Sequence, residues 1–150
     1  MILNDDVLIR VATETDIDVI ARISKENCIN PWTKEQLQQE LYYDFALLVC
    51  AVVKKKIVGF ISCHITEPEA HLNEIAVEGA FRRKHIATQL LSYCIENSIS
   101  HKCEYMTLEV RQSNTEAISL YSKFGFKELT IRKSLYTNPN EDAIVMRLDY

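Results

Sequence analysis

The segment from residue 45 to residue 77 constrains the fold most, because it is typical of three consecutive β-strands. Two apolar runs, FALLVCAVV and KIVGFISCHIT, are separated by a lysine turn, and the turn sequence EPE precedes a third run, AHLNEIAV. Strands that follow one another through short turns pair antiparallel. The segment therefore predicts hairpins that form part of a sheet.

Helical and strand patterns alternate on both sides of this segment. Before it, a strand is predicted at 7–12, followed by two helices, the second with capping-box spacing between Thr33 and Gln36. After it come a helix, a strand, a fourth helix that ends at Gly125, and a final hairpin. The order β-α-α-β-β-β-α-β-α-β-β predicts an α/β (α+β) fold. Its mixed, mostly antiparallel sheet of about seven strands is flanked by four helices, in one domain spanning 1–150.

Composition restricts the class of protein. The chain has a formal net charge of −4 and is 47% hydrophobic, which is ordinary for a globular domain and argues against general nucleic-acid binding. No apolar run is long enough to span a bilayer, and no signal peptide is visible. The five cysteines form no CxxC pair and lie mostly among apolar neighbours, which predicts reduced cysteines in a cytoplasmic protein without a metal site.

The segment FRRKHIATQLL, residues 81–91, places three cations directly before a predicted helix. The first N–H groups of a helix have no partner inside it, and together with the helix dipole they form a site that phosphate commonly occupies. Neither a Walker loop nor a GxGxxG fingerprint is present. From these residues alone, a phosphate site and a solvated basic face are equally good interpretations.

A second stretch with chemical potential is LEVRQSNTEAISLYSKFGF, residues 108–126. Glu109 lies on the second face of a predicted strand, where helices covering both faces would make it a usable base, whereas an exposed glutamate at a sheet edge is the simpler interpretation. Tyr121 shares the apolar stripe of its helix and is locally a core tyrosine. Asn114 is most simply a helix N-cap or loop residue.

These motifs occur together in one family. The stretches PW (31–32), EAHLNEIAV (69–77), FRRKHIA (81–87), LEVRQSNTEAISLYSKFGF (108–126) and EDAIVM (141–146) stand in the order and spacing of the GNAT superfamily of N-acetyltransferases. The chain resembles this superfamily over nearly its whole length, and within it the bacterial ribosomal-protein-alanine acetyltransferases, the RimI type. The resemblance implies acetyl-CoA as donor, direct transfer to an amine, and a protein N-terminus, such as that of a ribosomal protein, as acceptor.

The resemblance also implies roles for individual residues. The family's phosphate loop, of pattern Q/R-x-x-G-x-G/A, matches Arg82–Ala87, and its backbone amides would hold the pyrophosphate of CoA. The N–H of Val77 would be the oxyanion donor, Glu109 the general base and Tyr121 the general acid. The implied cofactor-binding residues are Ile75, Ala76, Val77, Arg82, Arg83, Lys84, His85, Ile86, Ala87, Thr88 and Asn114.

The chain departs from the family pattern at three places. His85 stands where the family usually has glycine, so either its Cβ displaces the pyrophosphate or its imidazole supplies a hydrogen bond. On the acceptor side, Trp32, Glu74 and Tyr136 are the implied substrate-binding residues, but Glu74 replaces an asparagine or threonine and Leu135 replaces one tyrosine of a pair. Two alternatives therefore stay open: a small-molecule amine as acceptor, and a non-catalytic CoA-binding or interaction module. Neither nucleic acid nor membrane is an expected partner, and nothing indicates the oligomeric state.

Overall fold

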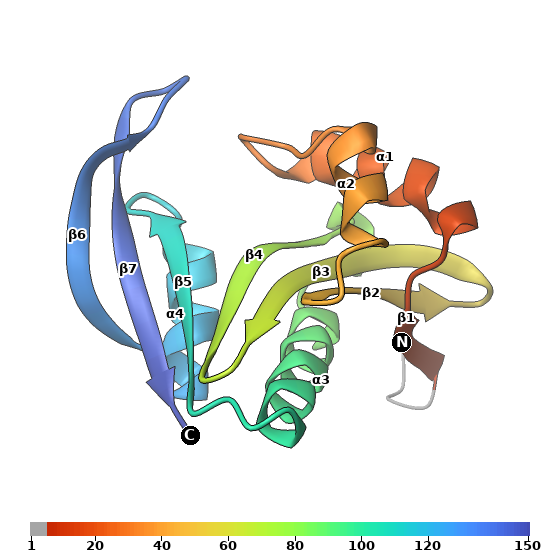
Figure 1. The fold of residues 1–150 in the computed structure, drawn as a ribbon. Helices are drawn as coiled ribbons and strands as arrows, with labels where there is room; N and C mark the ends of the chain where they lie inside the picture. Colours follow the sequence, from red (N-terminus) through yellow and green to blue (C-terminus); the bar gives the residue numbers. More distant parts are fainter. Residues whose placement is uncertain (1–5) are drawn as a thin grey trace.

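The computed structural model describes residues 6–150, and within them seven strands form one sheet (Figure 1). The sheet order is β1-β2-β3-β4-β5-β7-β6, and every neighbouring pair is antiparallel except the parallel pair β4–β5. The strands are β1 (Val7–Val11), β2 (Ala46–Val53), β3 (Lys56–Thr66), β4 (Glu69–Val77), β5 (Tyr105–Arg111), β6 (Lys127–Tyr136) and β7 (Glu141–Asp149). The helices are α1 (Ile17–Asn27), α2 (Lys34–Glu40), α3 (Ile86–Ser100) and α4 (Thr115–Phe124), with short 3₁₀ turns η2 (Glu14–Asp16) and η3 (Gly79–Phe81). The predicted fold class and element order are confirmed.

Local signals set several of these boundaries. At the start of α2, the Gln36 N–H donates to Thr33 Oγ1 at 3.1 Å and the Thr33 N–H donates to Gln36 Oε1 at 2.8 Å, which is the predicted capping box. Helix α4 ends where Gly125 adopts φ 102°, a left-handed conformation that glycine reaches without strain. Helix α3 begins at Ile86, so the three cations precede it instead of lying in its first turn.

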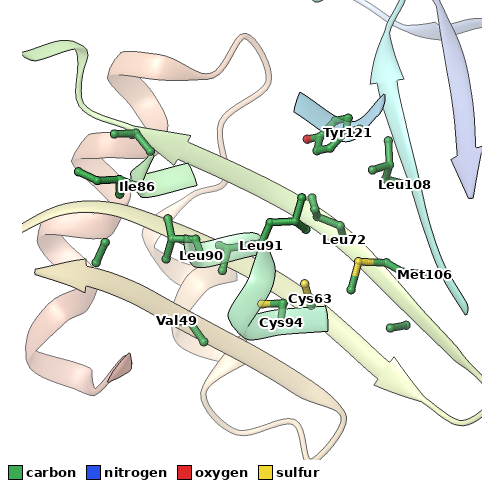
Figure 2. Packing of buried hydrophobic residues seen from close by; sticks show 14 of the residues in the cluster. Val49, Cys63, Leu72, Ile86, Leu90, Leu91, Cys94, Met106, Leu108 and Tyr121 are labelled. Carbon is green, nitrogen blue, oxygen red and sulfur yellow. The ribbon is translucent and has the colours of Figure 1, made fainter. Parts of the chain in front are cut away.

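Two apolar clusters cover opposite faces of the sheet. Helices α3 and α4 pack on one face, and α1 and α2 pack on the other. Figure 2 shows part of the first cluster, in which Leu90, Leu91 and Cys94 of α3 meet the strands. The buried cysteines, all with free thiols, are Cys50, Cys63, Cys94 and Cys103, as predicted for reduced core residues. No helix among residues 6–150 combines the length and apolar character needed to cross a membrane.

The parallel pair β4–β5 is much shorter than its strands. Residues Glu69–Leu72 pair with Tyr105–Leu108, and there the ladder ends, although β4 continues to Val77 and β5 to Arg111. Figure 1 shows the two strands close together at their beginnings and diverging beyond them. Each strand keeps its other neighbour, β3 or β7, over its remaining length. The sheet is therefore split in the middle, with one unpaired strand edge on each side of the split.

A β-bulge lies where the split begins. Ser62 of β3 pairs with Glu74, but the next residue, Cys63, pairs with Leu72, so Asn73 of β4 has no partner in that register. A bulge bends the strand that carries the extra residue and increases its twist. The bend accounts for the departure of β4 from β5 immediately after Leu72.

Candidate active site

The backbone of β4 is open towards the split. The Glu78 N–H donates to the Val58 carbonyl at 2.8 Å, so the even-numbered residues at the end of β4 face β3. Because successive residues of a strand alternate, the N–H and carbonyl groups of Ile75 and Val77 point to the side that β5 has left. The Val77 carbonyl accepts from Nε of Arg82 at 3.3 Å. The N–H groups of Ile75 and Val77 are therefore backbone donors that face the split.

The loop before α3 has an unusual backbone. Arg83 and His85 adopt positive φ angles of 59° and 63°, on either side of Lys84. Glycine takes this conformation most easily, and histidine is among the few other residues enriched there. The His85 carbonyl accepts from the Gln89 N–H at 3.1 Å, which makes Gln89 the first residue whose N–H is satisfied inside the helix. The loop therefore has the shape of a glycine-containing anion loop without the glycine.

The side chains of this loop divide into two groups. Arg82 is turned back on the protein, where it donates to Oδ1 of Asn27 at 2.7 Å as well as to β4. Arg83 is exposed and Lys84 half-buried, and neither forms an ion pair with any residue between 6 and 150.

The only buried side-chain polar atom in the described chain without a hydrogen-bond partner is Nε2 of Gln89. Nothing in the sequence marks Gln89, because glutamine in a helix is ordinarily exposed.

Helix α4 positions two of the predicted residues. Asn114 is its N-cap and accepts from the Ala117 N–H at 3.2 Å, which confirms the local interpretation. The Tyr121 ring is buried against Phe126, at 5.8 Å between centroids, and lies near Leu108 in the space between β4 and β5 (Figure 2). Within residues 6–150 its hydroxyl has no hydrogen-bond partner, and the hydroxyl oxygen is not fully buried. The ring belongs to the core, while the hydroxyl is available to a ligand.

Glu109 lies closer to the simpler of the two environments considered from the sequence. It follows Leu108, where the β4–β5 ladder ends, so β5 has no β4 partner at this residue and Glu109 stands on the strand edge exposed by the split. It is not sealed between helices, because its side chain is 25% exposed and its Oε2 accepts from Arg132 of β6 at 2.7 Å. An ion pair this exposed contributes little stability. Glu109 is thus an accessible carboxylate on the α1–α2 face, opposite to the face from which Tyr121 approaches.

Burial determines the protonation of the groups beneath α1. Ser24 donates a hydrogen bond to Glu74, and the Trp32 N–H donates to Ser24 Oγ at 3.1 Å. Burial raises the pKa of Glu74 above its usual value. Burial, reinforced by Glu74, raises the pKa of Cys28 to about 12, so this thiol stays protonated and is no nucleophile. Glu74 and Trp32, both predicted to bind substrate, thus share one hydrogen-bonded link between β4 and the α1–α2 loop.

Arg111 joins the two loops above the split. Its guanidinium is buried and donates to the carbonyls of Thr137 at 3.1 Å and Pro139 at 3.0 Å, in the β6–β7 loop. It also donates to Oδ1 of Asn30 in the α1–α2 loop and lies 4.5 Å over the ring of Tyr136. The sequence shows Arg111 only as part of a motif, because arginine is rarely buried. These contacts tie the α1–α2 loop, which carries Trp32, to the β6–β7 loop and to the end of β6, where Tyr136 lies.

No group of three or more histidine, cysteine, aspartate or glutamate residues between 6 and 150 is arranged to hold a metal ion. The arrangement therefore consists of an open backbone edge, an anion loop, an accessible carboxylate on one face and a free tyrosine hydroxyl on the other. Such a set of groups can bind a phosphate-bearing thioester and promote its attack by an amine.

Comparisons with known proteins agree with this interpretation. Residues 17–126 match the Acetyltransferase (GNAT) family. The ribosomal protein bS18-alanine N-acetyltransferase of Escherichia coli K12 is 33% identical over 139 residues, covering 89% of this chain and 91% of the relative. The N-alpha-acetyltransferase of Saccharolobus solfataricus is 34% identical over 158 residues, covering 94% of this chain and 92% of the relative.

The crystal structure of the ribosomal-protein-S18-alanine N-acetyltransferase from Escherichia coli matches with a TM-score of 0.88 at 30% sequence identity. The match covers 95% of this chain and 93% of that one. The resemblance seen in the motifs is confirmed, and the chain belongs to the GNAT family of acetyltransferases, as an acyltransferase that takes its acetyl group from acetyl-CoA.

Proposed function

We propose that the protein transfers the acetyl group of acetyl-CoA to the N-terminal α-amine of a protein, with a ribosomal protein as the first candidate and the cytoplasm as the place of action. The relatives named for alanine N-acetylation and N-alpha-acetylation support this acceptor class. The observation that carries the mechanism is the split sheet, with Glu109 on one face and the free Tyr121 hydroxyl on the other. Residues 1–150 act as one catalytic domain in this proposal.

The donor would bind along the β4 edge and the start of α3. The backbone N–H groups of the loop at His85 and of the first turn, including Ile86, Ala87 and Thr88, would hold the pyrophosphate. The unpaired cations Arg83 and Lys84 suit the outer phosphate of CoA. Arg82 would act indirectly, because its guanidinium is already held by Val77 and Asn27. The Val77 N–H would bind the thioester oxygen, with Ile75, Ala76 and Asn114 lining the same path.

Tyr121 would stabilise the departing thiolate. Burial raises the pKa of Tyr121 above its usual value near 10, so the hydroxyl stays protonated at neutral pH. A thiol has an ordinary pKa of about 8.5, so full proton transfer from so weak an acid would be unfavourable. A hydrogen bond that strengthens as negative charge develops on sulfur has no such penalty. Tyr121 therefore contributes as a hydrogen-bond donor in the transition state.

Glu109 would remove the proton of the acceptor amine. A peptide α-amine has a pKa of about 7.7–8.0, so roughly a tenth to a fifth of it is neutral at pH 7. A lysine with a pKa of about 10.4 is neutral in only about one molecule in two thousand. A modest, accessible carboxylate is therefore better suited to the α-amine. No covalent enzyme intermediate is needed, because holding both reactants in place supplies several kcal/mol, roughly 7–11 in the best cases.

The acceptor class is tested with three peptides and purified enzyme. A short peptide with a free N-terminal alanine should be acetylated on that amine, as shown by mass spectrometry. The same peptide with a blocked N-terminus and an internal lysine should give no product, because its amine is almost entirely protonated. Transfer to lysine alone, or only to small amines such as polyamines, would contradict the proposed acceptor and leave the acetyl-CoA site intact.

Glu109→Gln should lower kcat strongly at pH 7, because general acid–base groups contribute about 10²–10⁴-fold. The loss should shrink as the pH rises past about 8, where the amine is already neutral. Arg132→Gln is the matched control, since it breaks the same ion pair and keeps the carboxylate. Equal losses in both variants, independent of pH, would mean that the ion pair only orients β5 and β6.

Tyr121→Phe keeps the ring packing against Phe126 and removes only the hydroxyl, which has no partner within the described chain. Thermal stability and the Kd for acetyl-CoA should therefore be unchanged, while single-turnover chemistry slows by about 10²-fold or more. Rapid-quench measurement separates chemistry from product release. A loss smaller than about threefold in that step would assign Tyr121 to packing alone.

His85→Gly should tighten acetyl-CoA binding, by up to about tenfold or 1.4 kcal/mol, as measured by calorimetry. The imidazole has no partner within residues 6–150, and its removal lets a phosphate approach the backbone more closely. Arg83→Gly is the matched control, because it relieves a similar positive φ but removes a cation, and it should not tighten binding. Weaker binding by His85→Gly would show instead that the imidazole donates a hydrogen bond to the donor.

A further inference from the structure

A polar cluster next to Glu109 has no role in the mechanism above. His71 of β4 pairs in register with Thr107 of β5, just before the two strands separate. Nδ1 of His71 lies 2.8 Å from Oγ1 of Thr107, and the Thr107 hydroxyl donates to Oε2 of Glu69. Thr107 and Glu109 are two residues apart on one strand and so share a face. The cluster therefore lies on the same side of the sheet as the proposed base.

These two hydrogen bonds determine the tautomer of His71. A hydroxyl has one proton, and Thr107 uses it on the carboxylate of Glu69. Its contact with His71 must then be one in which Nδ1–H donates and the threonine oxygen accepts. In a neutral imidazole with a proton on Nδ1, Nε2 has a free lone pair. Nε2 has no hydrogen-bond partner within residues 6–150 and is not fully buried, so it can accept a proton.

The surroundings of His71 keep it neutral and able to accept a proton. Burial lowers the pKa of His71 below its ordinary 6.5, although Glu109 and Glu69 act in the opposite direction. The imidazole is therefore uncharged at pH 7, and it protonates only as the pH falls below about 6.5. The charged or titratable groups on the elements around it are Glu69 (β4), Glu109 (β5), His64 (β3), Glu40 (α2, 2.6 Å from His64), Arg132 (β6, on Glu109) and Arg147 (β7, in register with Thr107).

We propose that His71, held by Thr107 and Glu69, receives the proton that Glu109 takes from the acceptor amine. The inference rests on the proposed function, in which Glu109 is the base. In the first step an N–H bond of the ammonium breaks and an O–H bond forms on Glu109. In the second, that O–H bond breaks and an Nε2–H bond forms, with one water molecule relaying the proton because no hydrogen bond joins Glu109 to His71 among the described residues; Glu109 is left as carboxylate and His71 as imidazolium. The imidazolium then returns its proton to water.

The tautomer is tested without any acceptor. Nitrogen-15 NMR of the labelled protein at pH 7.5 should show His71 with a protonated Nδ1 and a bare Nε2. Thr107→Val keeps the shape and removes the hydroxyl, so it should give a mixture of tautomers, while Thr107→Ser should restore the single form. A proton on Nε2 in the unaltered protein would overturn the proposal. This result does not depend on whether the protein acetylates peptides.

The role in proton transfer is tested by pH–rate profiles on the free N-terminal peptide. His71→Gln should lower kcat/KM at pH 7 by about tenfold or more and remove an acid limb whose midpoint lies below 6.5. Thr107→Val should lower kcat/KM less, on the same acid limb of the profile. It replaces His71→Gln as the test variant if His71→Gln does not fold. The exposed His101 provides the control variant His101→Gln, with an unchanged profile.

An unchanged limb and rate in both the His71 and Thr107 variants would overturn the proposal. If the unaltered enzyme does not acetylate the peptide, the proposed acceptor is wrong. The same profiles are then measured with whichever amine it does acetylate, so that the two failures stay distinct.

Discussion

The early end of the β4–β5 ladder is the constraint on which the rest of the structure depends. A backbone N–H or carbonyl buried without a partner costs about as much as a lost hydrogen bond, so strands inside a sheet normally pair along their full length. Here the pairing stops after Leu72 and Leu108, while β3 and β7 hold the outer sides of the two strands. The groups left over, at Ile75 and Val77, are those that an extended ligand can satisfy. The same atoms are thus an interrupted sheet edge and, in the proposed function, the surface that binds the donor.

A split sheet needs something to set the distance between its halves. At one end this is the four-residue parallel ladder, and at the other it is Arg111, which belongs to the β5 half but binds Asn30 from the half that carries α1 and α2. Its remaining donors hold the carbonyls of Thr137 and Pro139. A planar guanidinium with five donors can fix several acceptors at once, which a lysine cannot. The opening between the halves is therefore defined by backbone pairing below and by one buried side chain above.

The sequence predicted the features that depend on short-range chemistry. The capping box at Thr33, the stop at Gly125 and the alternation of the strands are local, and all are confirmed. The length of the β4–β5 ladder was not predictable, because the residue pattern of one strand does not show where its pairing with the neighbouring strand ends. The pairing of Glu109 with Arg132 and the burial of Arg111 arise from contacts more than 20 residues apart in sequence. No single-residue pattern records such contacts, and this is why the ion pair of Glu109 with Arg132 was not predictable.

The pairing of Glu109 with Arg132 also bears on where the proton of the amine can end. Protonating Glu109 removes the negative partner of the Arg132 guanidinium 2.7 Å away. The neutral imidazole of His71 differs in this respect, because Glu69 and Glu109 attract it once it becomes charged. Its desolvation opposes this gain and keeps it uncharged at rest. In the proposed relay, these two effects leave His71 uncharged before the reaction and able to accept a proton during it.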